Sequence, residues 1–192
     1  MNHKPKLFLV SKSPRRKQLL EEMGYRFDIL LTNVEETYPK ELTPVQIAEY
    51  LSQLKLTSVN FSDYSECDLF ISCDTIVVLD DIIFGKPSTE AEAVNMLRLL
   101  SGKTHQVISG ITVATRSQQT TKHNITEVTF KKLSEEEIQY YITHFKPFDK
   151  AGGYGIQEWI GLIGVTSING CFYNVMGLPT QLLAELLPHK LV

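Results

Sequence analysis

Residues 11–16, Ser-Lys-Ser-Pro-Arg-Arg, have the composition of an anion-binding site. They follow a short apolar run, residues 7–10, that predicts a buried strand, and Ser13 with the proline after it is typical of a helix start. Free N–H groups at a helix N-terminus bind anions, and Arg15 and Arg16 add charged, forked donors. The segment therefore predicts a cradle for a phosphate chain. The alternative is a capped helix with two solvated arginines.

Asp74 lies in the middle of the most apolar segment of the chain, residues 68–79. Valine and isoleucine beside it predict a largely buried strand, in which an unpaired carboxylate is costly. Such a residue is typical of a metal ligand, of the partner of a cation, or of a base whose pKa is tuned by its surroundings. The alternative is an aspartate bonded to the backbone at a break in the strand.

Two lysines lie near the ends of predicted elements. Lys86 follows the strand expected at residues 82–84, between a glycine that lets backbone approach a ligand and a proline that stiffens the exit, which suits a phosphate contact. Lys55 lies in the C-terminal half of a helix that begins at the capping box of residues 43–46. It is either a surface charge favoured by the helix dipole or a second contact to an anion.

A second unusual loop, residues 149–157, contains three glycines among an acid, a base and an amide. The glycines let backbone come close to another group, and Asp149 and Gln157 can supply polar contacts, so the loop predicts a ligand clamp. His105 begins a predicted strand just after a turn. A lone histidine there is more often structural than catalytic, and we expect the structural role.

Signals for both helices and strands follow one another along the chain. Helix starts are expected at Ser13, Thr43, Thr89, Ser134 and just after Pro179, and stops at Gly24 and Gly102. Strands are expected at residues 7–10, 27–31, 68–79, 82–84, 105–115 and 121–130. We also expect residues 159–168 and 171–175 to form a β-hairpin around Asn169-Gly170, a pair typical of tight hairpin turns.

Composition restricts the class of protein. The chain has 192 residues, 43% of them hydrophobic and 21% charged, which predicts a folded, soluble protein. A net charge of -3 argues against broad nucleic-acid binding and favours a small anionic ligand at a local basic site. No run is long enough for a membrane span. The three cysteines are odd in number and lack CxxC spacing, which suits a reducing compartment, so we expect a cytoplasmic protein.

The residues resemble the Maf-like nucleoside triphosphate pyrophosphatases over essentially the whole chain. The matching blocks are residues 11–16 with Leu19-Leu20, Val34-Glu-Glu36, Lys55, Cys73-Asp-Thr75, Gly85-Lys-Pro87, Leu100-Ser-Gly102 with His105, residues 149–157, and Asn174-Val-Met-Gly-Leu-Pro179. The resemblance implies one domain over residues 1–192 with an α/β fold, in which helices flank an elongated mixed sheet and two lobes surround a central cleft. It also implies a homodimer.

The same resemblance implies hydrolysis of a nucleoside triphosphate between its α and β phosphates, with Mg²⁺ or Mn²⁺ as cofactor. Asp74-Thr75 resembles the branch that acts on dTTP and UTP in nucleotide-pool house-cleaning. The residues implied for substrate binding are Ser11, Arg15, Arg16, Lys55, Thr75, Lys86 and Gln157. Glu36 and Asp74 are the carboxylates implied near the metal. Asp74 is either the base that activates water or a metal ligand only.

Three departures from the family pattern stand out: Glu158 where many members have glycine, Cys73 where alanine or glycine is usual, and residues 170–174. We expect none of them to touch a charged motif residue. Two other functions use the same phosphate cradle: a nucleotide-binding regulator of cell division that does not turn over, and a pyrophosphatase for other modified nucleotides. A buried Asp74 favours a hydrolase over a pure binder, because a binder gains little from a carboxylate that faces a polyanion.

Overall fold

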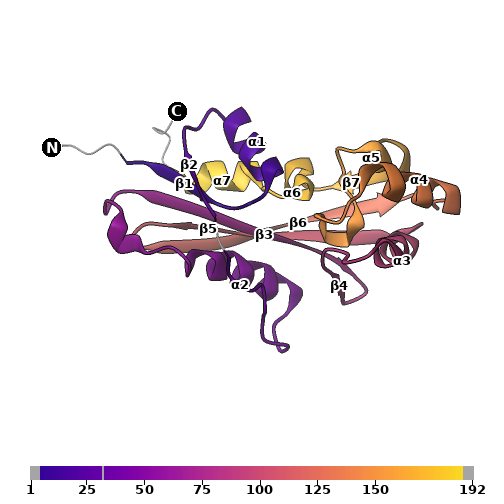
Figure 1. The fold of residues 1–192 in the computed structure, drawn as a ribbon, viewed down its shortest axis with the longest axis horizontal. Helices are drawn as coiled ribbons and strands as arrows, with labels where there is room; N and C mark the ends of the chain where they lie inside the picture. The colour runs from indigo at the N-terminus through magenta and orange to yellow at the C-terminus, as the bar shows by residue number, and fades with distance from the viewer. Residues whose placement is uncertain (1–4, 32, 188–192) are drawn as a thin grey trace. The chain divides into compact units, whose positions relative to one another are not determined.

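The computed structural model describes residues 5–31 and 33–187. In that part of the chain seven strands form one mixed sheet in the order β2-β1-β3-β5-β6-β7, with β4 paired to β3 (Figure 1). The strands are β1 (Leu7–Val10), β2 (Asp28–Leu30), β3 (Leu69–Leu79), β4 (Ile82–Phe84), β5 (Thr104–Ala114), β6 (Gln119–Phe130) and β7 (Val165–Asn169). β1 pairs in parallel with β2 and β3, whereas the β3–β4 and β6–β7 pairs are antiparallel. The predicted α/β class with a mixed sheet is confirmed.

Helices flank this sheet. They are α1 (Pro14–Glu22), α2 (Pro44–Leu56), α3 (Glu90–Leu100), α4 (Glu135–Phe145), α5 (Trp159–Gly164), α6 (Phe172–Met176) and α7 (Thr180–Leu186), with 3-10 turns η1 (Phe61–Asp63) and η2 (Ala151–Gly153). α1 and α7 lie on one side of the sheet and α2 on the other (Figure 1). No helix in the described ranges is long and apolar enough to cross a membrane.

The chain divides into two compact units. Unit 1 comprises residues 1–74, 109–124 and 177–192, and unit 2 comprises residues 75–108 and 125–176. Unit 1 contains an aromatic core in which Phe8 and Phe70 stack, with ring centroids 5.1 Å apart. Unit 2 has a larger core in which α3 packs against α4 and η2. The cleft implied by the resemblance stays a prediction.

The predicted helix starts are present. Ser13 accepts a hydrogen bond from the Arg16 N–H, and reciprocal capping boxes begin α2 and α4. At α3 the box is only half formed, because Thr89 caps Glu92 but the Glu92 carboxylate accepts from the Ser88 N–H instead. Past the end of α1, Gly24 has a φ of 85°, which side chains disfavour, so this glycine ends the helix as predicted.

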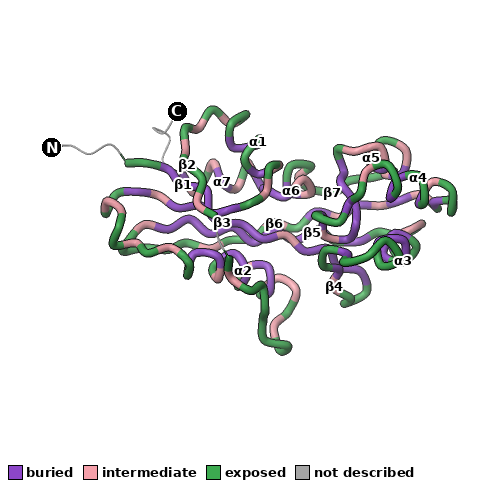
Figure 2. Tube along the Cα trace, viewed as in Figure 1, coloured by how far each residue is buried: buried purple, intermediate pink, exposed green. Residues whose placement is uncertain are grey.

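A tight hairpin joins β3 to β4 after the segment that carries Asp74. Asp80 and Asp81 have φ values of 48° and 65°, the combination required by the tight two-residue turn that matches strand twist. Val77 then pairs with Phe84 across the ladder. β3 is buried along almost its whole length (Figure 2), as its apolar sequence predicts.

The hairpin expected over residues 159–175 is wrong. Only β7 is a strand, and α5 and α6 on either side of it are helices. A short apolar run does not by itself distinguish strand from helix, and here buried Ile160 and Gly164 stand four residues apart on one helical face. A Cβ on Gly161 would lie 1.8 Å from the Ile156 carbonyl oxygen, so the first turn of α5 requires glycine there.

The second half of that expected hairpin is helical because of a buried asparagine. Gly170 does form a turn, with a φ of 129°, but the chain then coils and the Asn174 N–H donates to the Cys171 carbonyl. The Asn174 amide donates to the Val107 carbonyl and to the Thr126 hydroxyl, both 3.0 Å away. These contacts hold α6 against β5 and β6 within unit 2.

Candidate active site

Lys55, Asp74 and Glu36 form a charged cluster in unit 1. The Lys55 ammonium donates to Asp74 Oδ1 and to the Cys73 carbonyl, the latter at 3.2 Å, and it lies 3.2 Å from Glu36 Oε1. Lys55 is only 5% exposed. Its interpretation as a surface charge is therefore wrong, because the ammonium is buried between two carboxylates.

The packing of α2 explains why Lys55 points inward. Ile47, Leu51 and Lys55 recur every four residues on the buried face of the helix. The helix also lies very close to the sheet at Gly110 of β5. A Cβ there would be 2.1 Å from the Ala48 carbonyl oxygen, so only glycine permits this approach. The Ser72 hydroxyl donates to the Ser52 carbonyl at 2.6 Å, which ties α2 to β3 two residues before Asp74.

Asp74 is 6% exposed and lies on an unbroken strand. Its interpretation as an aspartate tied to backbone at a strand break is therefore wrong, since its carboxylate is bonded to the Lys55 ammonium. Asp74 and Glu36 share the Lys55 ammonium, which brings two carboxylates from separate segments together.

The carboxylates suit a hard divalent cation. Mg²⁺ is usually bound by one or two carboxylates, with water and substrate phosphate oxygens completing its shell. Glu36 and Asp74 converge on the same ammonium, and the Glu36 side chain is 41% exposed, which leaves it open to a ligand. Among the described residues no three His, Cys, Asp or Glu gather as a metal-binding group. Glu36 and Asp74 therefore fit an ion whose other ligands are water and substrate oxygens.

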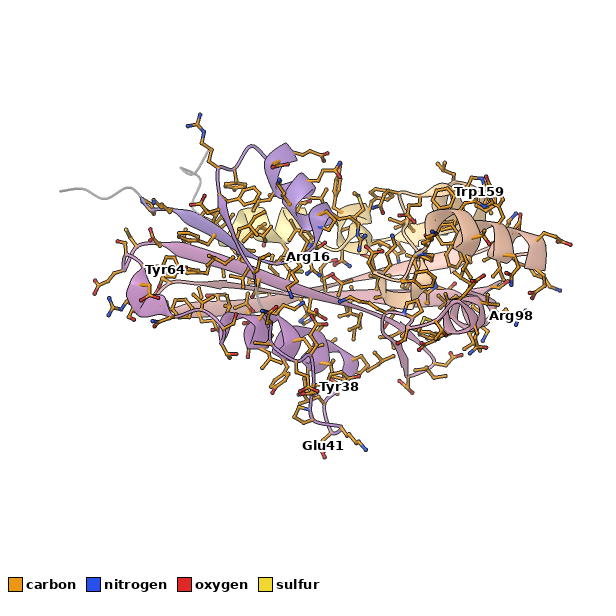
Figure 3. The ribbon with its side chains drawn as sticks, in the orientation of Figure 1. Arg16, Tyr38, Glu41, Tyr64, Arg98 and Trp159 are labelled. Carbon is orange, nitrogen blue, oxygen red and sulfur yellow. The ribbon has the colours of Figure 1, made fainter. Side chains whose placement is uncertain are left out.

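The predicted phosphate cradle at the start of α1 is formed in part by buried residues. Ser11 is buried, and its hydroxyl accepts from the Ser13 N–H at 3.1 Å. Arg16 is 9% exposed, and its Nε donates to the Gly177 carbonyl at 2.7 Å, so this side chain (Figure 3) also anchors α1. The interpretation of Arg16 as a solvated arginine is wrong. Arg15 is half-buried.

Cys73 takes part in the same contact. Its thiol donates to the Gly177 carbonyl at 3.4 Å, so that one carbonyl oxygen accepts from both Arg16 and Cys73. The carbonyl therefore connects the start of α1 to the residue before Asp74. Reasoning from the sequence missed this link, since nothing in the spacing of these residues indicates it.

The remaining predicted site residues lie in unit 2. Thr75 is half-buried on β3, whereas Lys86 and Gln157 are exposed. The Gly152 N–H donates to the Gly85 carbonyl at 3.0 Å, which brings the glycine-rich loop next to the strand end that carries Lys86. Gly152 has a φ of 70°, so the loop depends on glycine at that position.

His105 is buried beside Tyr154. Its Nε2 lies 2.7 Å from the Tyr154 hydroxyl, and its Nδ1 has no hydrogen-bond partner among the described residues. Burial lowers the pKa of this imidazole to about 4, so it is neutral at pH 7. These contacts favour the structural role over a catalytic one.

Reasoning from the sequence also missed a second charged cluster, within the glycine-rich loop. Lys150 is buried, and its ammonium lies 2.7 Å from Asp149 Oδ1 and 3.1 Å from Glu158 Oε1. The expectation that Glu158 touches no charged motif residue is therefore wrong. Asp149, expected to face a ligand, pairs with Lys150.

Comparison with known proteins identifies the family. The model of the family described as Maf-like protein matches residues 6–190. The chain is 49% identical to the dTTP/UTP pyrophosphatase of Phocaeicola vulgatus, over 93% of this chain and 92% of that protein. It is 49% identical to the dTTP/UTP pyrophosphatase of Cytophaga hutchinsonii, over 95% and 83%. For the Porphyromonas gingivalis protein of that name the identity is 44%, over 94% and 92%. With its α/β sheet and the matched motifs, the chain belongs to the Maf-like protein family.

Proposed function

We propose that this protein is a nucleoside triphosphate pyrophosphatase that hydrolyses dTTP and UTP to the monophosphate and pyrophosphate. The activity for which the relatives are named supports this proposal. The observation that carries it is the buried Asp74 carboxylate, held by Lys55 beside Glu36. A hydrolase needs such a group to place and activate water, whereas a protein that only binds a polyanion gains nothing from it.

In this mechanism a water oxygen attacks the α phosphorus. The bond then breaks between the α phosphorus and the oxygen that bridges the α and β phosphates. Asp74 accepts the proton of the attacking water on a carboxylate oxygen, and pyrophosphate leaves. Lys55, already bonded to Asp74, orients that carboxylate. The proposed phosphate-binding residues are Ser11, Arg15, Arg16, Lys55 and Lys86.

Glu36 and Asp74 are the residues that would hold a divalent cation, Mg²⁺ or Mn²⁺. When bound, the cation supplies positive charge that stabilises negative charge on the phosphates. If Asp74 serves as metal ligand only, the same two side chains still hold the ion. We infer the homodimer and the single domain over residues 1–192 from the family resemblance, and the cytoplasmic location from the cysteine content. The two ends of that domain lie outside the described residues.

Recognition of the base is assigned to Thr75, Gln157 and the backbone of the glycine-rich loop. A uracil-type edge presents two carbonyls around an N–H, and an amide side chain can donate to one group and accept from another. Cytosine presents an amino group and an unprotonated nitrogen there. Polar partners arranged for a uracil-type edge would then stay unpaired, so CTP is discriminated against.

The decisive experiment compares kcat/KM for dTTP, UTP, CTP, GTP and 7-methyl-GTP with Mg²⁺ present, and identifies the phosphate product. We expect pyrophosphate and a preference for dTTP and UTP. Release of orthophosphate would overturn the reaction class. A preference for 7-methyl-GTP would overturn only the assigned base.

A further inference from the structure

The glycine-rich loop is built around one buried lysine, Lys150, and two carboxylates that pair with it. We call Tyr141, Asp149, Lys150 and Glu158 the Lys150 cluster, and all four belong to unit 2. Lys150 lies between the two acids, and Glu158 uses its other oxygen, Oε2, to accept a hydrogen bond from the Tyr141 hydroxyl. Each Glu158 oxygen thus has its own protein donor.

The Tyr141 hydroxyl connects Glu158 to the loop backbone. It accepts from the Gly155 N–H at 2.9 Å while it donates to Glu158. Burial raises the pKa of the Tyr141 phenol, and the nearby Glu158 charge raises it further. The phenol therefore keeps its proton and remains a donor at neutral pH.

Gly155 allows the Glu158 carboxylate to fold back against the loop. A Cβ at position 155 would lie 2.8 Å from Glu158 Cδ and 3.1 Å from Lys150 Cε. The Glu158 N–H also donates to the Gly155 carbonyl at 3.0 Å, which closes the turn over residues 155–158. Side chain and main chain of Glu158 therefore hold the same turn.

Gln157 lies in this turn, between buried Ile156 and Glu158, whose backbone and carboxylate are hydrogen-bonded. Residues 152–156 are buried and Gln157 is exposed. On the other side, the Glu158 carbonyl accepts from the Gly161 N–H at 2.9 Å, which starts α5. The backbone on both sides of Gln157 is thus fixed by contacts of residues 155–158.

We propose that Glu158 is a positioning residue for recognition of the uracil-type base: by holding the turn over residues 155–158, it fixes Gln157 and the loop backbone without touching the substrate. This inference rests on the proposed function, because it concerns the same substrate. Discrimination by hydrogen bonds requires donors and acceptors held in place, since a mobile amide can rearrange to suit cytosine. Loss of Glu158 therefore weakens recognition of the base more than it slows chemistry at the phosphate.

The test compares Glu158→Gln and Glu158→Ala with the wild-type protein in steady-state hydrolysis of dTTP, UTP and CTP. Glutamine keeps the shape and an acceptor for Tyr141 but removes the charge opposite Lys150. For alanine we expect KM for dTTP to rise about tenfold, kcat to stay within about threefold, and the dTTP-to-CTP ratio of kcat/KM to fall about tenfold. Glutamine should give an intermediate loss.

The matched control is Glu135→Gln, which removes a carboxylate of the same unit that pairs with Arg98 on the surface. It should leave KM and the ratio unchanged. If Glu158→Ala does not fold, Glu158→Gln and Tyr141→Phe carry the test, and Tyr141→Phe should lower the same ratio. The effects of Glu158→Ala and Tyr141→Phe should not add, because each removes the hydrogen bond between these two side chains.

An unchanged ratio in both variants, or a fall in kcat with the ratio kept, would overturn the positioning role. The proposed function is judged separately by the wild-type protein in the same assay. If the wild type releases no pyrophosphate from dTTP or UTP, the proposed function fails and the positioning role fails with it. If the wild type is active and selective while the variants match it, only the role of Glu158 fails.

Discussion

Two buried lysines, Lys55 in unit 1 and Lys150 in unit 2, each lie between two carboxylates. Lys55 joins three separate parts of unit 1: α2, the strand β3 and the loop that carries Glu36. Lys150 joins residues of a single loop, because Asp149 is its neighbour and Glu158 is eight residues away along the chain. The first arrangement assembles distant elements, whereas the second closes a local turn.

The two clusters differ most in what completes the carboxylates. In the Lys150 cluster, Tyr141 donates to the second oxygen of Glu158, so the protein itself supplies both partners. In the Lys55 cluster, the Glu36 side chain is 41% exposed. Each cluster keeps one exposed carboxylate, because the Asp149 side chain is 54% exposed. The Tyr141 donor on Glu158 suits structural support, whereas we propose reaction chemistry for the Lys55 cluster, which contains Asp74.

Removal of divalent cations should separate the clusters most strongly. EDTA should abolish hydrolysis, because the proposed reaction needs the divalent cation that Glu36 and Asp74 would hold. Addition of Mg²⁺ or Mn²⁺ should restore it. The thermal unfolding midpoint without nucleotide should hardly change, because the Lys150 cluster uses protein donors only. Product release and unfolding measured on one sample check both expectations. Full activity in metal-free buffer would contradict the role given to the Lys55 cluster.

Asp74→Asn should lower turnover by at least about 10²-fold, the scale expected when a general base is removed. Nucleotide binding and the fold should persist, because asparagine keeps the shape. Turnover and nucleotide affinity are measured together, with Asp81→Asn as control, since Asp81 occupies a turn with a φ of 65° that asparagine tolerates. Near-normal hydrolysis by folded Asp74→Asn would remove Asp74 from the mechanism.

The same substitution in each cluster tests the contrast directly. Lys150→Met should reduce the free energy of unfolding by about 3 kcal/mol, because it leaves Glu158 without its buried counter-ion, while kcat stays within about threefold. Lys55→Met should lower kcat/KM by about 100-fold. Urea unfolding and steady-state kinetics on both variants measure the two effects. An equal loss of turnover would mean that the clusters do not differ in function.

His105 shows what happens to a buried base without an acidic partner. Its pKa is lowered to about 4 by burial, so the unfolded chain, with a pKa near 6.5, binds more protons between these values. Stability is therefore complete above about pH 6.5 and is lost as pH falls towards 4, by up to about 3 kcal/mol.

Urea unfolding at pH 7.5 and at pH 5 measures this loss. His105→Gln should flatten the dependence on pH, whereas Tyr140→Phe, at an exposed side chain that does not titrate in this range, should not. A wild-type protein as stable at pH 5 as at pH 7.5 would contradict the lowered pKa.

The smallest expected effect is that of Tyr141→Phe. Loss of the hydroxyl removes a donor to Glu158 and an acceptor for the Gly155 N–H, which should cost about 1 to 2 kcal/mol of the free energy of unfolding. Tyr140→Phe is the control, because Tyr140 is exposed on the same helix. Equal stability of the two variants would show that the second donor adds nothing to the Lys150 cluster.

Local signals in the sequence determined much of the fold. Helix ends are set by local signals: capping residues, prolines in first turns and glycines with positive φ, which act through neighbouring backbone groups. Ser13, Thr43 and Gly24 therefore mark helix ends independently of tertiary contacts. The apolar run around Asp74 likewise determined a buried strand and identified one carboxylate that needs a partner. The candidate site residues followed from these signals and from the family resemblance.

Only the tertiary structure decided which groups meet. The sequence allows Lys55 to be a surface residue. Only the packing of α2 on the sheet brings its ammonium to Asp74. Residues 159–175 read as strands until Asn174 is hydrogen-bonded inside unit 2. From the sequence, Glu158 is only a departure from the glycine that many family members have; the turn in the structure brings it to Lys150. Burial and pairing depend on contacts between residues distant in sequence, and periodicity along the chain carries no information about those partners.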